Sequence, residues 1–100
     1  MVNPSVKISE KKIKDFCQRY QVRRMALFGS VLRNDFRPDS DIDVLVLFDS
    51  SAHVTFITLG KMRRELSGIF QRPVDLVPQD GLKPAIRENI LSSAQEVYAA

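Results

Sequence analysis

The amino-acid sequence predicts an α/β fold, a small β-sheet with helices packed on it. Short runs of β-branched and aliphatic residues, typical of strands, precede residues 29, 49 and 78. Around these runs, apolar residues recur at the spacing of an amphipathic helix. The resulting order is helix, strand, short helix, strand, helix, strand, helix. A length of 100 residues predicts one domain, spanning 1–100, that can bury a modest core.

Three longer helices are predicted from capping residues and apolar stripes. Ser9 can cap the first, whose buried stripe is Ile13, Phe16, Cys17 and Tyr20. The second runs from about Val54 to Phe70, with an apolar stripe of Leu59, Met62, Leu66, Ile69 and Phe70. Pro84 fits the first turn of the last helix, whose stripe is Leu82, Ile86, Ile90 and Leu91. Residues 95–98 form either a last short strand or a tail.

The strands are predicted from the apolar runs themselves. The first run, Met25–Phe28, ends at a Gly-Ser pair, and residues 31–36 after that pair can form a short helix. The second begins near Asp41, and both of its faces are apolar beyond Asp43. A strand covered on both sides belongs in the middle of a sheet. The third run, 72–78, is bounded by prolines.

Composition excludes several classes of protein. The formal net charge of +3 permits an anionic partner without requiring one. Cys17 is the single cysteine, so no internal disulfide can form, and its place in a helical stripe indicates a packed thiol. The single histidine, His53, lacks the spacing of a zinc site. No segment is long enough to span a membrane and no signal peptide is evident, so we expect a cytoplasmic protein.

Three aspartates lie where strands are predicted. Asp41 and Asp43 point to the same face at the start of the second strand, and Asp75 lies within the third apolar run. Neighbouring anions in a poorly solvated place are costly unless something compensates them. A divalent cation does so, and Mg²⁺ typically takes one or two carboxylates plus substrate phosphates. For Asp75, a salt bridge to a neighbouring arginine such as Arg72 is the alternative.

The pair Gly29-Ser30 indicates the other half of a ligand site. A glycine at a strand-to-helix turn lets the backbone approach a ligand closely, and a helix N-terminus presents free N–H groups to an anion. Ser30 adds a hydroxyl donor, and Arg33 and Arg37 follow at positions that can reach phosphate oxygens. Taken singly, such motifs are mostly turn or cap residues. Their combination with three aspartates predicts a phosphate site beside a metal site.

The combined pattern resembles the nucleotidyltransferase (DNA polymerase β-like) superfamily. The resemblance rests on Gly29-Ser30, ten intervening residues and Asp41-Ile42-Asp43. Residues 28–30 and 37–43 are similar to the smallest branch, the MNT-type (minimal nucleotidyltransferase) proteins. The likeness continues through 72–77 and 81–84, and covers residues 23–98. MNT-type proteins often carry Arg where Val31 stands here and Gly where Asn34 stands.

The resemblance implies a nucleotidyltransferase fold with a mixed sheet and transfer of AMP from ATP. It implies catalytic and metal-binding roles, with two Mg²⁺ ions, for Asp41, Asp43 and Asp75. It implies nucleotide binding by Gly29, Ser30, Arg33 and Arg37. The partner that it implies is a HEPN-type toxin, which an MNT-type antitoxin adenylylates on tyrosine.

Two other functions remain open. The chain is compatible with a non-catalytic antitoxin that neutralises its partner by covering it. It is also compatible with a transferase acting on a small molecule or RNA, although an aromatic and basic stacking surface is lacking and direct nucleic-acid binding is not expected. Because so small a chain has little surface left to grip a large acceptor, the acceptor or a second chain must supply the rest. A homo- or hetero-oligomer fits this requirement.

Overall fold

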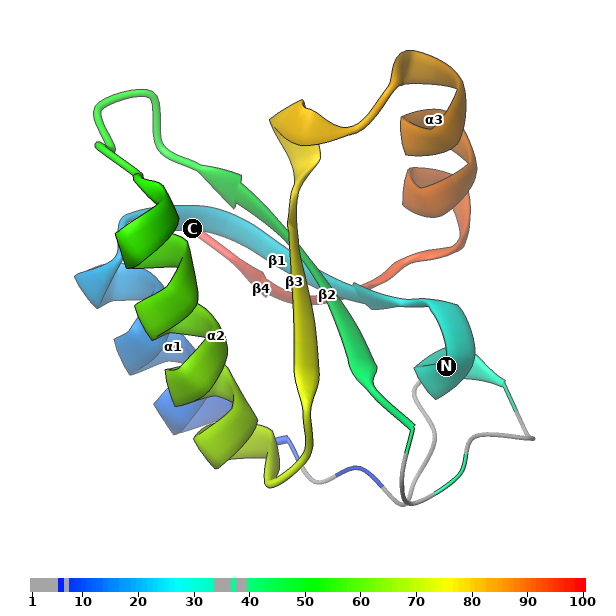
Figure 1. The fold of residues 1–100 in the computed structure, drawn as a ribbon, viewed down its shortest axis with the longest axis horizontal. Coiled ribbons are helices and arrows are strands. Elements are labelled where there is room, and N and C mark those ends of the chain that lie inside the picture. Colours follow the sequence, from blue (N-terminus) through cyan, green and yellow to red (C-terminus); the bar gives the residue numbers. More distant parts are fainter. Residues whose placement is uncertain (1–5, 7, 34–36, 38–39) are drawn as a thin grey trace.

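The predicted order of elements is confirmed in the computed structural model, which describes residues 6, 8–33, 37 and 40–100 (Figure 1). The α-helices are α1 (Glu10–Arg19), α2 (Phe56–Phe70) and α3 (Pro84–Ser93). The strands are β1 (Val22–Phe28), β2 (Ile42–Phe48), β3 (Val74–Pro78) and β4 (Gln95–Ala99). Two short 3-10 helices, η1 (Gly29–Leu32) and η2 (Gln79–Gly81), follow β1 and β3. Residues 95–98, for which the sequence allowed either a strand or a tail, therefore belong to a strand.

The short helix after the first strand differs from its prediction. It was expected over residues 31–36, whereas η1 begins at Gly29 and ends at Leu32. Residues 34–36 lie outside the described part of the chain. The turn is tight because Gly29 adopts a positive φ, and the N–H of Arg33 closes it by donating to the carbonyl O of Ser30 at 3.0 Å.

The sheet is mixed, with the strand order β3-β2-β1-β4. β1 pairs antiparallel with both β2 and β4, whereas β2 pairs parallel with β3. β2 is therefore an inner strand, as its two apolar faces predicted. β3 lies at one edge of the sheet, and among the described residues no strand lies beside the outer side of its backbone.

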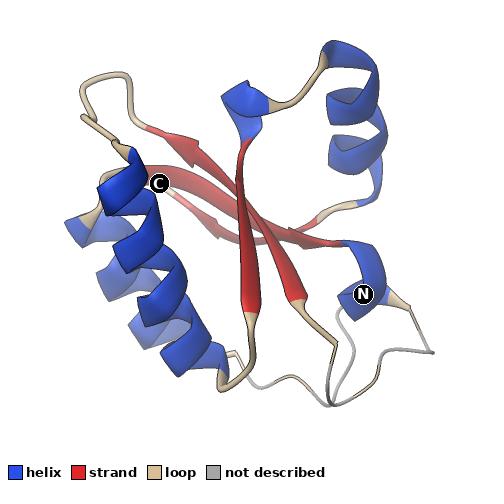
Figure 2. Cartoon of the chain, viewed as in Figure 1, coloured by secondary structure: helices blue, strands red, loops and turns tan. Residues whose placement is uncertain are grey.

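The core lies between one face of the sheet and the helices α1 and α2, which run side by side (Figure 2). Alternate residues of β2, Ile42, Val44 and Val46, are buried in it. The helices contribute Ile13, Phe16, Cys17, Met62, Leu66 and Phe70, as their stripes predicted. At the surface, Arg19 Nη2 and Glu65 Oε1 are 2.6 Å apart and join the two helices.

Helix boundaries follow the caps. Ser9 is the N-cap of α1, as predicted, and its hydroxyl accepts a hydrogen bond from the N–H of Lys12 at 3.4 Å. α2 begins two residues later than predicted because Thr55 is its N-cap and accepts from the N–H of Thr58 at 3.2 Å. Among the described helices, none has the length and apolarity needed to cross a membrane.

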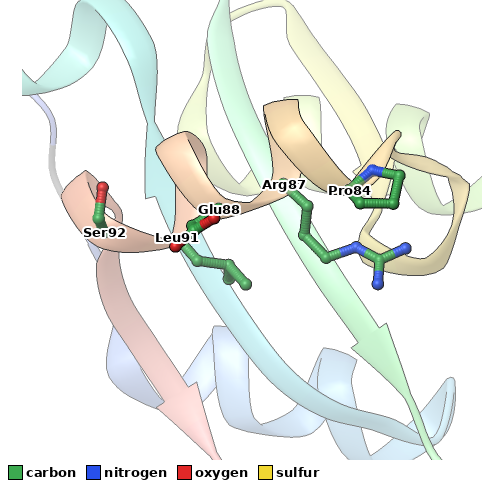
Figure 3. Close-up of a pocket in the computed structure, with 5 residues that line it drawn as sticks. All are labelled: Pro84, Arg87, Glu88, Leu91 and Ser92. Carbon is green, nitrogen blue, oxygen red and sulfur yellow. The ribbon is translucent and has the colours of Figure 1, made fainter.

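The third helix, α3, lies across the sheet from α1 and α2, and none of its residues is buried (Figure 1). A buried position for Ile86 was wrong, because this side chain is 50% exposed. Arg87 lies on the same side of α3 as Leu91 and donates from Nη2 to the carbonyl O of Leu82 at 3.0 Å (Figure 3). These two residues line a cavity of 490 Å³ with Pro84, Glu88 and Ser92. α3 therefore adds little to the core.

The packed position of Cys17 gives a testable prediction. Its side chain has no exposed surface, and burial raises the pKa of the thiol to about 12. We expect iodoacetamide to leave Cys17 unmodified in the folded protein at mildly alkaline pH and to alkylate it fully in urea. Intact-mass spectrometry measures both states. Equal rates in the two states would contradict the packed position.

Candidate active site

Pairing of β2 with β3 brings two of the predicted aspartates together. Asp43 and Asp75 are direct partners in the parallel register, so both side chains lie on the same face of the sheet. That face is the one away from α1 and α2, because Ile42 and Val44, on either side of Asp43, are buried in the core. Asp41 lies just ahead of β2 and is exposed. Asp43 is half-buried and Asp75 is exposed.

The neighbouring residues shift the pKa of the Asp43 carboxyl. Burial raises the pKa of its carboxyl above the ordinary value, and the negative charges of Asp75 and Asp41 raise it further. The positive charge of Arg33 opposes this rise. Asp43 is therefore the central carboxylate, with both other predicted aspartates and one predicted arginine in electrostatic contact.

Gly29 lies directly against the same carboxylate. Its φ of +76° is in the left-handed region, and a Cβ built on it would overlap Oδ2 of Asp43. The contact arises because Phe28, the last residue of β1, is the partner of Asp43 in the antiparallel register. Ser30, the next residue, is half-buried in η1. The glycine end and the aspartate end of the predicted site are therefore adjacent.

The backbone before Asp41 is tied to the start of β3. Arg72 Nη1 donates to the carbonyl O of Arg37 at 3.0 Å, and the same carbonyl accepts from the N–H of Ser40 at 3.0 Å. The N–H of Arg37 donates to Ser40 Oγ at 3.2 Å, and the N–H of Ile42 donates to the carbonyl O of Pro73 at 2.9 Å. This positioning role of Arg72 was missed, because nothing in the local sequence indicates a contact with a carbonyl 35 residues away.

The remaining predicted arginines are only partly placed. Arg33 lies at the end of η1, exposed, and affects Asp43 electrostatically. Arg37 is exposed, and its backbone takes part in the turn at Ser40. Residues 34–36, 38 and 39 around it lie outside the described part of the chain. Phosphate binding by either arginine stays a prediction.

The donor set fits a hard divalent cation. Asp43 and Asp75 offer carboxylate oxygens from neighbouring strands, and the raised pKa of Asp43 indicates negative charge that a cation would relieve. Within the described residues, no group of three or more His, Cys, Asp or Glu side chains is gathered closely enough to hold an ion. Mg²⁺ in proteins commonly binds one or two carboxylates, and water and phosphate oxygens complete its ligands. The carboxylates of Asp43 and Asp75 are therefore enough protein ligands for such an ion.

Removing the charge of Asp43 should stabilise the fold. The raised pKa means that the folded protein disfavours the ionised carboxyl, so the protein loses stability as the pH rises through the pKa of folded Asp43. We expect Asp43→Asn to raise the free energy of unfolding by roughly 1 kcal/mol at neutral pH in the absence of metal. Urea titration measures this change.

The gain should vanish in acid, where Asp43 is protonated in the folded and unfolded states alike. Asp80→Asn, at an exposed position in η2, is the matched control. A gain at Asp80 as large as that at Asp43 would contradict the assigned repulsion.

Gly29 should tolerate no side chain. Gly29→Ala places a Cβ against Oδ2 of Asp43 and forces alanine into positive φ, so we expect a loss of about 1–3 kcal/mol in the free energy of unfolding. Gly81→Ala is the control, because a Cβ at Gly81 meets nothing within 4 Å. Thermal unfolding by circular dichroism compares the two variants. Equal midpoints would show that the approach of Gly29 to Asp43 is not tight.

Known proteins resemble this chain over most of its length. Residues 9–97 match the family model described as "Nucleotidyltransferase domain". The protein adenylyltransferase MntA of Thermococcus cleftensis is 35% identical over 79 residues, which cover 78% of this chain and 77% of the relative.

Solved structures share the fold. A crystal structure of a toxin–antitoxin with AMP-PNP matches with a TM-score of 0.75 at 20% identity, over 93% of this chain and 75% of that chain. A structure of a tri-AMPylated Shewanella oneidensis HEPN toxin in complex with an MNT antitoxin matches with a TM-score of 0.67 at 20% identity, over 91% of this chain and 70% of that chain. With its mixed sheet and the family match over residues 9–97, the chain belongs to the nucleotidyltransferase family.

Proposed function

We propose that this nucleotidyltransferase is a metal-dependent protein adenylyltransferase that transfers AMP from ATP to a hydroxyl of a protein acceptor. The observation that carries the proposal is the position of Asp43, which lies between Gly29, with no side chain, and Asp75 on the neighbouring strand. This arrangement joins a backbone that accommodates phosphate to carboxylates that accommodate a cation. The name of the MntA relative, protein adenylyltransferase, supports the same activity.

The reaction forms one bond and breaks another. The acceptor oxygen bonds to the α-phosphorus of ATP, the bond from that phosphorus to the bridging oxygen breaks, and pyrophosphate leaves as the hydroxyl proton is lost. Gly29 and Ser30 bind the β- and γ-phosphates, and Arg33 and Arg37 add positive charge to the leaving pyrophosphate. Asp41, Asp43 and Asp75 would hold two Mg²⁺ ions, which neutralise phosphate charge and make the attacking hydroxyl more acidic.

The proposed acceptor is a HEPN-type toxin, which the chain would neutralise as its antitoxin. Support comes from the fold neighbours, one of which is an MNT antitoxin in complex with a tri-AMPylated HEPN toxin. The nucleotide is supported by the neighbour that contains AMP-PNP. A cytoplasmic site of action fits the substrate ATP and the unpaired Cys17.

The alternative function is that of an antitoxin that covers its partner without catalysis. The two functions differ in one respect: only the enzyme needs its carboxylates in order to neutralise the toxin.

Loss of the carboxylates should abolish transfer. We expect Asp41→Ala/Asp43→Ala to lower labelling of the co-expressed HEPN-type toxin by at least about a hundredfold, because removal of preorganised charge at the reacting phosphate has effects of this size. ATP labelled at the α-phosphate, Mg²⁺ and gel autoradiography measure transfer, and growth after toxin induction measures neutralisation.

The matched control is Asp15→Ala/Asp80→Ala, which removes two exposed aspartates away from the site. A toxin that is bound and neutralised equally well by the Asp41/Asp43 variant, without label, would establish the covering function.

A further inference from the structure

A groove at the edge of the sheet opens beside Asp75. It has a volume of 190 Å³ and lies between α2 and the edge strand β3. Its lining is Leu59, Gly60 and Arg63 from the helix, with Asp75 and Leu76 from the strand. A water molecule occupies about 30 Å³ of liquid, so the groove has the volume of about six waters, enough for one side chain and too little for a folded element.

The two sides of Asp43 are chemically different. On the β1 side lie Gly29 and Ser30, where the proposed function places the leaving phosphates. On the opposite side lies Asp75, on the last strand of the sheet. In phosphoryl transfer the attacking and leaving oxygens are roughly in line on opposite sides of phosphorus. An acceptor oxygen therefore approaches from the β3 edge, around which the groove extends from α2 to Asp75.

We propose that this groove binds a short extended segment of the acceptor protein, with an acidic residue next to the hydroxyl that receives AMP. The inference rests on the proposed function and adds the recognition surface for its second substrate. The occupant is a polypeptide strand: it fits a groove bordered by an unpaired strand edge, to which extended peptides add by backbone hydrogen bonds. Pro73 and Pro78 at the two ends of β3 limit that pairing to a few residues.

Charge and space in the groove favour this occupant. Arg63 is exposed and forms no ion pair or hydrogen bond with any described residue, so its guanidinium is available to an acidic side chain. Gly60 keeps the wall open, because a Cβ built there meets nothing within 4 Å. A glycine inside a helix lowers the stability of the fold relative to alanine. The space that the groove needs explains why a glycine lies at position 60 in spite of this loss.

The chain offers a matched control for each residue. Gly68 is a second glycine of α2 with open space around its Cβ position, and it does not line the groove. Arg64 is an exposed arginine next to Arg63 that does not line the groove either. Gly60→Leu is therefore compared with Gly68→Leu, and Arg63→Glu with Arg64→Glu.

The probes are two blocked peptides that carry one tyrosine, flanked by glutamate in the first and by lysine in the second. With α-labelled ATP and Mg²⁺, we expect Gly60→Leu to lower kcat/KM for the glutamate peptide at least about tenfold. Arg63→Glu should lower it roughly three- to tenfold and favour the lysine peptide instead. Both control variants should match the wild type, and nucleotide affinity should be unchanged in all four.

Binding is measured separately by titrating the ¹⁵N-labelled protein with the glutamate peptide in the presence of Mg²⁺ and AMP-PNP. Shifts at residues 59–63, 75 and 76 would support the groove even if no AMP is transferred to the peptide. Failure of the proposed function would instead appear as an unlabelled HEPN-type toxin, so the two failures are distinguishable. Shifts confined to other surfaces, no shifts at millimolar peptide, or unchanged transfer by Gly60→Leu would overturn the inference.

Discussion

The site depends on the close approach of one glycine to one carboxylate. The end of β1 pairs with Asp43, and the chain then turns at Gly29 with a positive φ, so close to Asp43 that a Cβ on Gly29 would overlap Oδ2. Any side chain at this turn would separate the two ends of the site. The parallel pairing with β3 places Asp75 on the other side of Asp43. Strand register thus places Gly29 and Asp75 on opposite sides of the Asp43 carboxylate.

The rest of the fold leaves that line accessible. α1 and α2 cover only one face of the sheet, so the core can be fully buried while the carboxylates stay on the other face. α3 lies on the opposite side of the sheet from α1 and α2, without any buried residue. Because β3 is an edge strand, the site is also open from the side. A chain of 100 residues therefore keeps both a core and an accessible candidate site.

Local patterns predicted most of this arrangement, and long-range contacts were what they missed. The inner place of the strand containing Asp43 was predicted because both of its faces are apolar, and Gly29 was singled out because a glycine at such a turn lets the backbone approach a ligand closely. The contact of Arg72 with the carbonyl of Arg37 depends on tertiary structure and has no local signal. The exposure of Ile86 was missed because an apolar stripe does not reveal whether a partner surface exists. The groove at Gly60 likewise appears only when α2 is packed against β3.

The energetic cost at Asp43 favours the enzyme over a protein that only covers its partner. Burial and two neighbouring anions disfavour the charge on Asp43, so the unliganded fold is destabilised at neutral pH. A ligand that binds only the folded state restores stability in proportion to its affinity and concentration. A divalent cation with a nucleotide would offset the repulsion at this position, whereas a protein partner docked elsewhere would not. A covering antitoxin would gain stability with asparagine at position 43, and the aspartate there is best explained by a site that binds a cation.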